Sequence, residues 1–138
     1  MRKILHCKIH RATVTDANLD YVGSISIDEL LIESAGLCVY EEVHIVDVTN
    51  GARLHTYVIP APKGSGIIQI NWAAAHLVRP NDLVIIMGYR YLVDEKIDGF
   101  HPKIVFVDSN NNIIDQSSQN EIVTPGYKIW LIILSIRM

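Results

Sequence analysis

The chain has 138 residues, of which 49 % are hydrophobic, and its formal net charge is −3. This length and composition predict one domain with a substantial apolar core and exclude a disordered chain. The 12 lysines and arginines and the 15 acidic residues are spread along the sequence, so no basic surface of the kind that binds nucleic acid is expected.

The predicted elements are mostly short strands separated by turn residues. In chain order, segments with strand patterning cover residues 3–9, 13–18, 21–27, 42–49, 53–59, 67–71, 83–87 and 103–107. Short helical stretches interrupt them at residues 28–35 and 73–77. Many short strands with few helices predict a mainly β fold, and specifically a small β-barrel.

Turn and cap residues indicate where these elements end. Ser26 followed by Glu29 is a capping-box pattern that predicts the start of the first helix, and Gly36 is suited to end it. Asn50-Gly51 is the strongest short signal for a hairpin between the strands on either side of it. Residues 60–66, rich in proline and glycine, predict a loop.

A Gly-Ser bond inside the predicted strand 21–27 has a chemical as well as a structural meaning. If the hydroxyl of Ser24 attacks the carbonyl of Gly23, the peptide becomes an ester; elimination then leaves dehydroalanine, and hydrolysis leaves a pyruvoyl group on a new N-terminus. The dipeptide alone is weak support, because Gly64-Ser65 also occurs and is typical of an ordinary turn. A glycine within a strand pattern also indicates a bulge or a bend.

The end of the chain differs from the rest. The run Ile129–Ile136 is strongly apolar but shorter than the roughly 20 residues that cross a bilayer, so no membrane span is expected. A final strand or a contact between subunits is the simpler interpretation, while a weak membrane contact and a poorly packed tail stay open. We therefore divide the chain into a barrel domain, residues 1–116, and an atypical apolar C-terminal tail of uncertain structure, residues 117–138.

Several motifs occur in the order and at the spacing of one known family. They are Lys8–Ala17, Tyr21–Ser24, Val48–Tyr57, Asn71–His76 and Asp82–Ile86. On these motifs the chain resembles the aspartate 1-decarboxylase family, small pyruvoyl-dependent enzymes that make β-alanine for pantothenate biosynthesis. The resemblance implies a double-psi β-barrel, a homotetramer and L-aspartate as the substrate. It also implies a zymogen that cleaves itself between Gly23 and Ser24.

The same resemblance implies roles for residues around that bond. Ser24 becomes the pyruvoyl cofactor, whose Schiff base with the substrate amine takes up the electron pair left by carbon dioxide. Tyr57 corresponds to the proton donor, and Thr56 contacts the substrate and assists processing, through a bond to the oxyanion at Gly23. Successive strand residues point to opposite faces, so Thr56 and Tyr57 share one site only at an oligomer interface or in a locally twisted strand.

Two cations and two further side chains complete the implied site. Arg53 and Lys8 match family positions and suit the two carboxylates of aspartate, but which cation binds which carboxylate stays open. His10 and Tyr21 lie near the site by the same resemblance. For them, assistance in binding or processing and ordinary packing are equally good interpretations.

The predicted helical stretch near residue 73 resembles the substrate loop of the family. There Asn71 is followed by Ala73 and Ala74, whose small side chains let backbone N–H groups approach a carboxylate. The chain departs from the family at Trp72, where glycine is usual; either the indole turns outward, or the pocket is smaller. Asn81 also replaces a usual glycine, but asparagine tolerates left-handed geometry.

No metal site is expected. His6 and His10 would stand about 13 Å apart on a strand, and the other histidines have no ligand spacing. Cys7 and Cys38 form neither a disulfide framework nor a zinc motif, and Met1–Leu5 lacks the apolar stretch of a secretory signal, so a cytoplasmic protein is expected. Some members of the family need a helper protein for maturation, and the sequence leaves such a partner open.

Three functions are compatible with these residues. The leading hypothesis is a self-processed, pyruvoyl-dependent L-aspartate decarboxylase. The alternative is a non-catalytic or unprocessed β-barrel that acts through protein contacts at Trp72 and the apolar tail. A third keeps the pyruvoyl chemistry but changes the amino acid, for instance to glutamate; it ranks lower because Trp72 would shrink a pocket rather than enlarge it.

Overall fold

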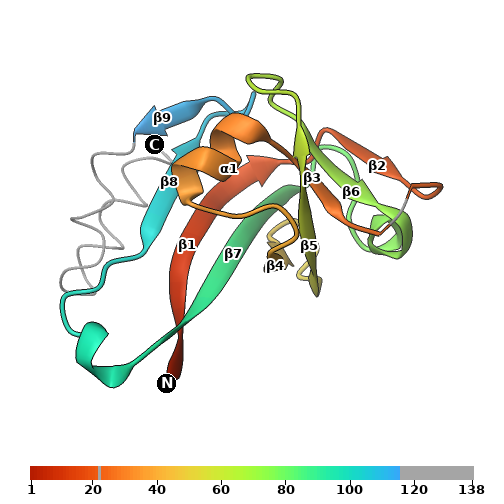
Figure 1. The fold of residues 1–138 in the computed structure, drawn as a ribbon. Coiled ribbons are helices and arrows are strands. Elements are labelled where there is room, and N and C mark those ends of the chain that lie inside the picture. Colours follow the sequence, from red (N-terminus) through yellow and green to blue (C-terminus); the bar gives the residue numbers. More distant parts are fainter. Residues whose placement is uncertain (22, 116–138) are drawn as a thin grey trace.

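The computed structural model describes residues 1–21 and 23–115, and its fold is mainly β with short helices, as the sequence predicts. The predicted tail, residues 117–138, lies outside the described residues. Figure 1 shows the elements, which are β1 (Arg2–Thr13), β2 (Asp16–Asn18), β3 (Ile25–Asp28), α1 (Glu29–Ala35), β4 (Glu42–Asp47), β5 (Arg53–Ala61), β6 (Ile68–Asn71), η1 (Trp72–His76), β7 (Leu83–Leu92), η2 (Asp94–Lys96), β8 (Lys103–Val107) and β9 (Ile113–Asp115). No helix in the described part is long and apolar enough to cross a membrane.

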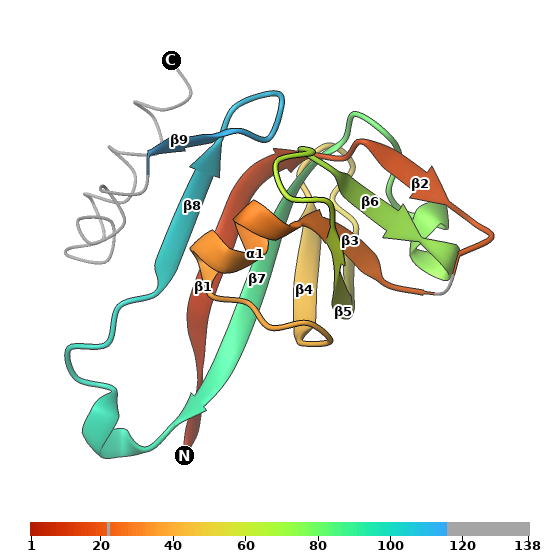
Figure 2. The same ribbon diagram turned by 45° about the horizontal axis from the view of Figure 1, so that its top comes forward.

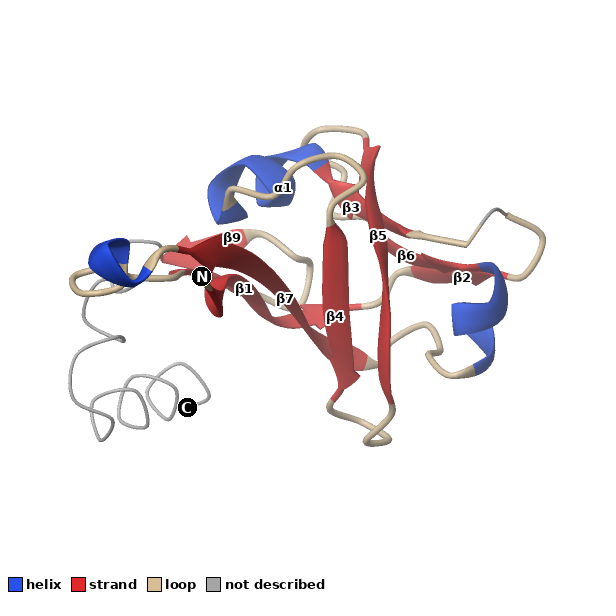
Figure 3. Cartoon of the chain, turned by 60° about the horizontal axis from the view of Figure 1, so that its bottom comes forward, coloured by secondary structure: helices blue, strands red, loops and turns tan. Residues whose placement is uncertain are grey.

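The strands form one mixed sheet in the order β2-β6-β3-β5-β4-β7-β1-β8-β9. β1 and β2 stand far apart in this order, yet only Val14 and Thr15 separate them in the chain. The sheet must therefore curl until these regions meet, as Figure 3 shows. Backbone hydrogen bonds tie this corner, from Val14 N to Asp82 O at 2.9 Å and from Thr15 N to Ile68 O at 2.8 Å. The predicted small β-barrel is confirmed by this closure.

The core fills the inside of the curled sheet. Along β4, Val43 and Ile45 are fully buried while His44 between them is only half-buried, because successive strand residues point to opposite faces. Helix α1 packs against β1, β3 and β8 and covers one side of this core (Figures 1 and 2). The largest fully buried side chains come from several strands and from α1: Ile9, Ile25, Ile27, Leu31, Ile45, Ile68, Ile70, Ile86 and Phe106.

The start of α1 differs from the prediction and its end agrees with it. The helix begins at Glu29, one residue after the predicted start at residue 28, but the predicted cap at Ser26 is wrong. Ser26 is part of β3, and Asp28 is the N-cap, accepting a backbone N–H two residues on at 2.9 Å. Gly36 has φ +74° and forms the left-handed C-cap, as predicted. The Asp28 carboxylate also accepts the N–H groups of Gly64 and Gly66, each at 2.8 Å. One buried side chain thus joins the helix start to the loop after β5.

Three further differences concern two strand boundaries and two short elements. β3 begins only at Ile25, because the chain bends around Gly23 before regular pairing starts. The apolar run predicts an end of β7 at Met87, whereas β7 continues to Leu92 because β1 pairs with it as far back as Arg2. The sequence does not predict η2 and β9, which have three residues each and are too short to show a periodic pattern.

Candidate active site

Ser24 lies in a buried corner where β3 meets β6. Ile25 pairs with Ile70 in antiparallel register, which brings the preceding Ser24 next to Asn71. The Asn71 side-chain amide donates to Ser24 Oγ at 2.8 Å, and the Asn71 backbone N–H donates to the Ser24 carbonyl at 3.0 Å. The exposed fractions of the two residues are 1 % and 0 %. The hydroxyl is therefore held in a fixed direction away from bulk water.

A second contact fixes the Asn71 amide itself. Gln69 donates from Nε2 to Asn71 Oδ1 at 2.8 Å, while Asn71 Nδ2 also lies 3.2 Å from Ser26 Oγ. A buried polar network whose members all have partners holds one arrangement, because any rotation would leave a polar atom unpaired. Sequence reasoning missed Gln69, since a polar residue that alternates with buried isoleucines is typical of any half-exposed strand.

Trp72 contacts the residue on the other side of the Gly23–Ser24 bond. It has φ +55°, a left-handed conformation that glycine adopts freely and bulky residues rarely adopt. The residue is 60 % exposed, so of the two predicted alternatives the structure shows the outward-turned ring. The ring also lies against Gly23, because a Cβ added to Gly23 would stand 3.2 Å from Trp72 Cε3. Asn71 thus holds Ser24, and the next residue contacts Gly23.

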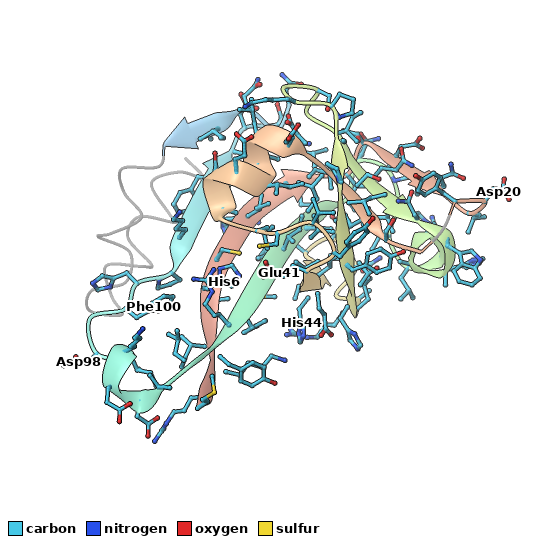
Figure 4. The ribbon with its side chains drawn as sticks, viewed as in Figure 1. His6, Asp20, Glu41, His44, Asp98 and Phe100 are labelled. Carbon is cyan, nitrogen blue, oxygen red and sulfur yellow. The ribbon has the colours of Figure 1, made fainter. Side chains whose placement is uncertain are left out.

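An open hollow lies beside Trp72, the residue that contacts Gly23. Its volume is about 400 Å³, and it is lined by Leu19, Asp20, Tyr21 and Trp72. Figure 4 shows Asp20 projecting outward at this end of the molecule. Ala73 is exposed in η1, whereas Ala74 packs against the core. The structure therefore gathers Tyr21, Gly23, Ser24, Asn71, Trp72, Ala73 and Ala74 into one region, which the motifs predict.

β5 brings Tyr57 to the same corner. β3 and β5 run parallel, with Ile25 opposite Val58. The residues that precede these two, Ser24 and Tyr57, therefore come level at the same end of the strand pair. Neighbouring strands lie about 4.8 Å apart, so this register brings the two backbones into close proximity.

Thr56 and Tyr57 lie on opposite faces of β5. Thr56 pairs with Val43, whose side chain is fully buried, so Thr56 points toward the inner face and Tyr57 toward the outer face. On the outer face the ring of Tyr40 lies 6.3 Å from the ring of Tyr57, centroid to centroid. The strand keeps the alternation that the sequence predicts, so one copy of the chain presents these neighbours to different sides.

The two predicted cations belong to separate strands. Lys8 of β1 is opposite Met87 of β7, Met87 is opposite His44 of β4, and His44 is opposite His55 of β5. Three strand spacings, about 14 Å along the sheet, therefore separate Lys8 from β5. Arg53 is exposed at the start of β5. The intervening strands keep the two cations apart in one copy of the chain.

His10 lies in another part of the barrel. It is buried and packs edge-on against Phe106, with ring centroids 5.6 Å apart. A hollow of about 570 Å³ opens beside it, lined also by Arg11, Leu83 and Ile114, and Ser24 does not line this hollow. His10 thus packs against Phe106 on one side and borders a hollow that Arg11 and Asp108 also line, so both interpretations of this residue stay open.

A buried pair of carboxyl groups braces the turn that leads to Arg53. The Asp47 Oδ1 atom accepts the N–H groups of Thr49 and Asn50, at 2.8 and 3.2 Å. Burial, and then the neighbouring Asp82 carboxyl, raise the pKa of Asp47 to about 6, while the Asp47 carboxyl lowers the pKa of Asp82. Asp47 is therefore the carboxyl of the pair that keeps its proton to the higher pH.

Histidines and cysteines have other roles. Within residues 1–21 and 23–115, no group of three His, Cys, Asp or Glu side chains is placed to hold a metal ion. Burial raises the pKa of the Cys7 thiol to about 12, so this residue is a protonated core side chain and not a nucleophile. His6 Nε2 lies 2.6 Å from Glu41 Oε2, a contact that no sequence pattern indicates because the two residues are far apart in the chain.

Known proteins resemble this chain over most of its length. Residues 1–114 match the family described as Aspartate decarboxylase. A protein named Aspartate 1-decarboxylase from Corynebacterium efficiens is 56 % identical over 114 residues, which cover 83 % of this chain and 84 % of that protein. One of the same name from Acaryochloris marina is 48 % identical over 124 residues, 90 % of this chain and 95 % of that protein. The crystal structure of the rationally designed mkDPBB_sym_86 protein, 20 % identical, covers 63 % of this chain and 95 % of its own with a TM-score of 0.44.

Proposed function

Because the chain belongs to the aspartate decarboxylase family, whose members are enzymes that decarboxylate aspartate, we propose that it gains its cofactor by cutting its own backbone between Gly23 and Ser24. The proposed product is a pyruvoyl group at residue 24. With it, the enzyme converts L-aspartate to β-alanine and carbon dioxide in the cytoplasm, for pantothenate biosynthesis.

Each step of the proposed cleavage uses atoms of the chain and water. Ser24 Oγ attacks the carbonyl carbon of Gly23, the C–N bond breaks, and the nitrogen of residue 24 takes a proton. Loss of the α-proton of residue 24 then expels the Gly23 carboxylate and leaves dehydroalanine. Water adds to the imine form, and ammonia leaves. The pyruvoyl group so formed would supply a ketone that condenses with the substrate amine, with loss of water, so that the electron pair left by carbon dioxide can be delocalised.

The residues present fit this chemistry. The observation that carries the proposal is the buried hydrogen bond of 2.8 Å from Asn71 Nδ2 to Ser24 Oγ, beside a glycine that has no side chain to obstruct attack. Because the nucleophile is already oriented next to its target carbonyl, the first step has a smaller entropic cost. The ordinary Gly64-Ser65 bond has no such support, because that segment lies in an exposed loop.

The outer face of the sheet supports the substrate roles. Lys8 and Arg53 would each hold one carboxylate of aspartate, and the assignment of cation to carboxylate stays open. Tyr57, level with Ser24 on the neighbouring strand, would donate the proton that replaces carbon dioxide, while Thr56 would assist processing. Asn71, Ala73 and Ala74 would bind the substrate from the other side.

The scattering of these groups supports an assembly. Lys8 points outward from β1, and Arg53 and Tyr57 point outward from β5, so strands β4 and β7 separate Lys8 from the other two within one copy. A second copy that packs on this face would bring a cation from one chain to the tyrosine of the other. We therefore propose a homo-oligomer, a tetramer as the family resemblance implies, with sites between its subunits.

The intact mass of the purified protein under denaturing conditions tests the cleavage. We expect fragments 1–23 and 24–138, the larger one lighter by one ammonia than a chain that begins with serine. Ser24→Ala should stay full-length and release no carbon dioxide from aspartate. Ser65→Ala, which alters the other Gly-Ser bond, is the matched control and should be processed normally.

Other outcomes would change the conclusion. A wild-type chain that stays whole and never gains carbonyl reactivity would overturn self-cleavage and favour a non-catalytic barrel. Cleavage that occurs only after addition of an extract of the native host would assign maturation to a helper protein. Carbon dioxide released faster from glutamate than from aspartate would overturn the substrate.

A further inference from the structure

A partly buried histidine–glutamate pair lies outside the residues assigned so far. His6 of β1 and Glu41, in the turn before β4, approach to 2.6 Å, and their side chains are only 4 % and 19 % exposed. Figure 4 shows the two labelled side chains close together. Gly88 of β7 makes room for them, because a Cβ there would stand 2.8 Å from His6 Nε2. Removing such groups from water is costly, so the contact needs a structural or functional reason.

The second oxygen of Glu41 closes the turn that contains it. Glu41 Oε1 accepts the backbone N–H of Cys38 at 3.0 Å, and the Glu41 N–H donates to the Cys38 carbonyl at 3.1 Å. Within this turn Tyr40 has φ +71°, a left-handed conformation that is rare for an aromatic residue. A strained residue of this kind persists only where its surroundings hold it. Glu41 restrains Tyr40 in this way, because its side chain joins the turn to β1.

The turn is attached to the backbone next to Tyr57. Tyr40 N donates to Val58 O at 2.7 Å, and Val58 N donates to Glu41 O at 3.0 Å. Val58 directly follows Tyr57, and its partner across the strands is Ile25, which directly follows Ser24. The ring of Tyr40 also lies beside the ring of Tyr57. Any movement of the turn would therefore reach Tyr57 through its backbone and through its ring.

We propose that the His6–Glu41 pair is a positioning element for Tyr57. It fixes residues 38–41 against Val58 and thereby sets the direction of the phenol toward residue 24. This inference rests on the proposed role of Tyr57 as proton donor. Neither His6 nor Glu41 touches the substrate in this account, so both act through Tyr40 and Val58.

Replacement of Glu41 tests the proposal on the processed enzyme. For Glu41→Ala we expect kcat per pyruvoyl group to fall by about tenfold to a hundredfold, as small misplacements of catalytic groups do, with KM changed less than about twofold. Glu41→Gln should recover most of this loss, because its amide still accepts from Cys38 and can still bond to the His6 ring. Glu33→Ala is the control, since Glu33 makes an exposed ion pair with Lys63 at 3.1 Å.

A second variant covers the case in which Glu41→Ala does not fold. Tyr40→Gly relieves the left-handed conformation and removes only the ring beside Tyr57, so we expect a lower kcat without a lower unfolding temperature. If either variant folds and turns over like the wild type per pyruvoyl group, the pair is merely structural and the proposal is overturned. A wild-type chain that is never cleaved overturns the proposed function, and this inference with it. If the wild type is cleaved and the Tyr57→Phe variant is fully active, the proposed role of Tyr57 is overturned, and this inference with it, while the proposed self-cleavage stands.

Discussion

The corner at Ser24 and the outer face of the sheet are built in opposite ways. In the corner, the Ser24 hydroxyl is buried and accepts a hydrogen bond, 2.8 Å long, from the Asn71 side chain of the same chain. On the outer face, Lys8 and Arg53 extend from different strands and Arg53 is exposed. The Ser24 corner is assembled within one copy, whereas strands β4 and β7 keep Lys8 apart from Arg53 in one copy. The proposed self-cleavage and the proposed binding of the substrate would therefore depend on different parts of the molecule.

This difference separates two measurable steps. If cleavage depends on the corner alone, substitutions on the outer face should leave the fragments unchanged and affect only turnover. If the two regions cooperate already in the precursor, substitutions on either should impair cleavage. The rate of fragment formation and the kinetics of the processed enzyme are thus separate readouts for the two regions.

The largest effect is expected from Asn71→Ala. The variant loses the bond that orients Ser24 Oγ, so we expect cleavage to slow by about a hundredfold. The time course of fragment formation by denaturing mass spectrometry measures this rate. Gln69→Ala leaves the bond to Ser24 and removes only the bond that steadies the Asn71 amide, so it should slow cleavage less than Asn71→Ala does. Equal rates for wild type and Asn71→Ala would show that the amide does not orient the nucleophile.

A smaller effect is expected from the cations. Lys8→Met and Arg53→Met keep an apolar stem but lose the charge, so each should raise KM for aspartate by about ten- to a hundredfold, the equivalent of one charged hydrogen bond. Cleavage should proceed as in the wild type. Lys96→Met, an exposed lysine of η2, serves as the control. Slow cleavage in Lys8→Met or Arg53→Met would mean that the two regions are coupled before processing.

Local chemistry explains which parts of the fold are predictable. The hairpin at Asn50-Gly51 and the C-cap at Gly36 depend on the conformational preferences of one or two residues, so the sequence indicates both. The start of α1 does not depend on local preferences alone. Ser26 could cap the helix or pair in the sheet, and its pairing with Gln69 of β6 prevails over the local capping pattern. β7 runs past its apolar segment for the same reason: β1 pairs with it over its full length.

The candidate site shows the same division. Motifs in register predict the corner, and the structure brings Ser24, Asn71 and Trp72 together there. The support of Asn71 by Gln69, and the contact between His6 and Glu41, could not be predicted. Each depends on how the closed sheet juxtaposes distant or ordinary polar residues, for which the sequence has no periodic signal. The role of each residue in turnover stays a prediction.

The buried pair near Arg53 should make stability depend on pH. Asp47 has a pKa of 3.8 when unfolded and of about 6 when folded, so the folded state binds its proton more tightly. The resulting stability is complete below pH 3.8 and is lost as pH rises through about 6. Asp47→Asn stays neutral and keeps an acceptor for the turn. As pH rises, the free energy of unfolding of the variant should therefore increase relative to that of the wild type, by about 1–3 kcal/mol.

Urea denaturation at about pH 4.5 and about pH 7.5 measures this difference within the range where Asp47 titrates. Asp98→Asn alters an exposed carboxylate and should show no such gain. A difference between Asp47→Asn and wild type that is the same at both pH values would mean that the proton on Asp47 does not stabilise the fold. The turn before Arg53 would then depend on its backbone bonds alone.

The smallest expected effect concerns Trp72, which contacts Gly23 in a left-handed backbone conformation. A bulky residue at φ +55° carries about 1–2 kcal/mol of strain that glycine would not, and glycine in turn adds freedom to the unfolded chain that offsets part of the gain. We therefore expect Trp72→Gly to be more stable than Trp72→Ala by up to about 1 kcal/mol in thermal unfolding, because alanine loses the ring but keeps the strain. Wild type more stable than both would mean that the contact of the indole with Gly23 outweighs the strain. In that case the residue that departs from the family helps to hold the bond that is proposed to break, and slower cleavage of Trp72→Gly would follow.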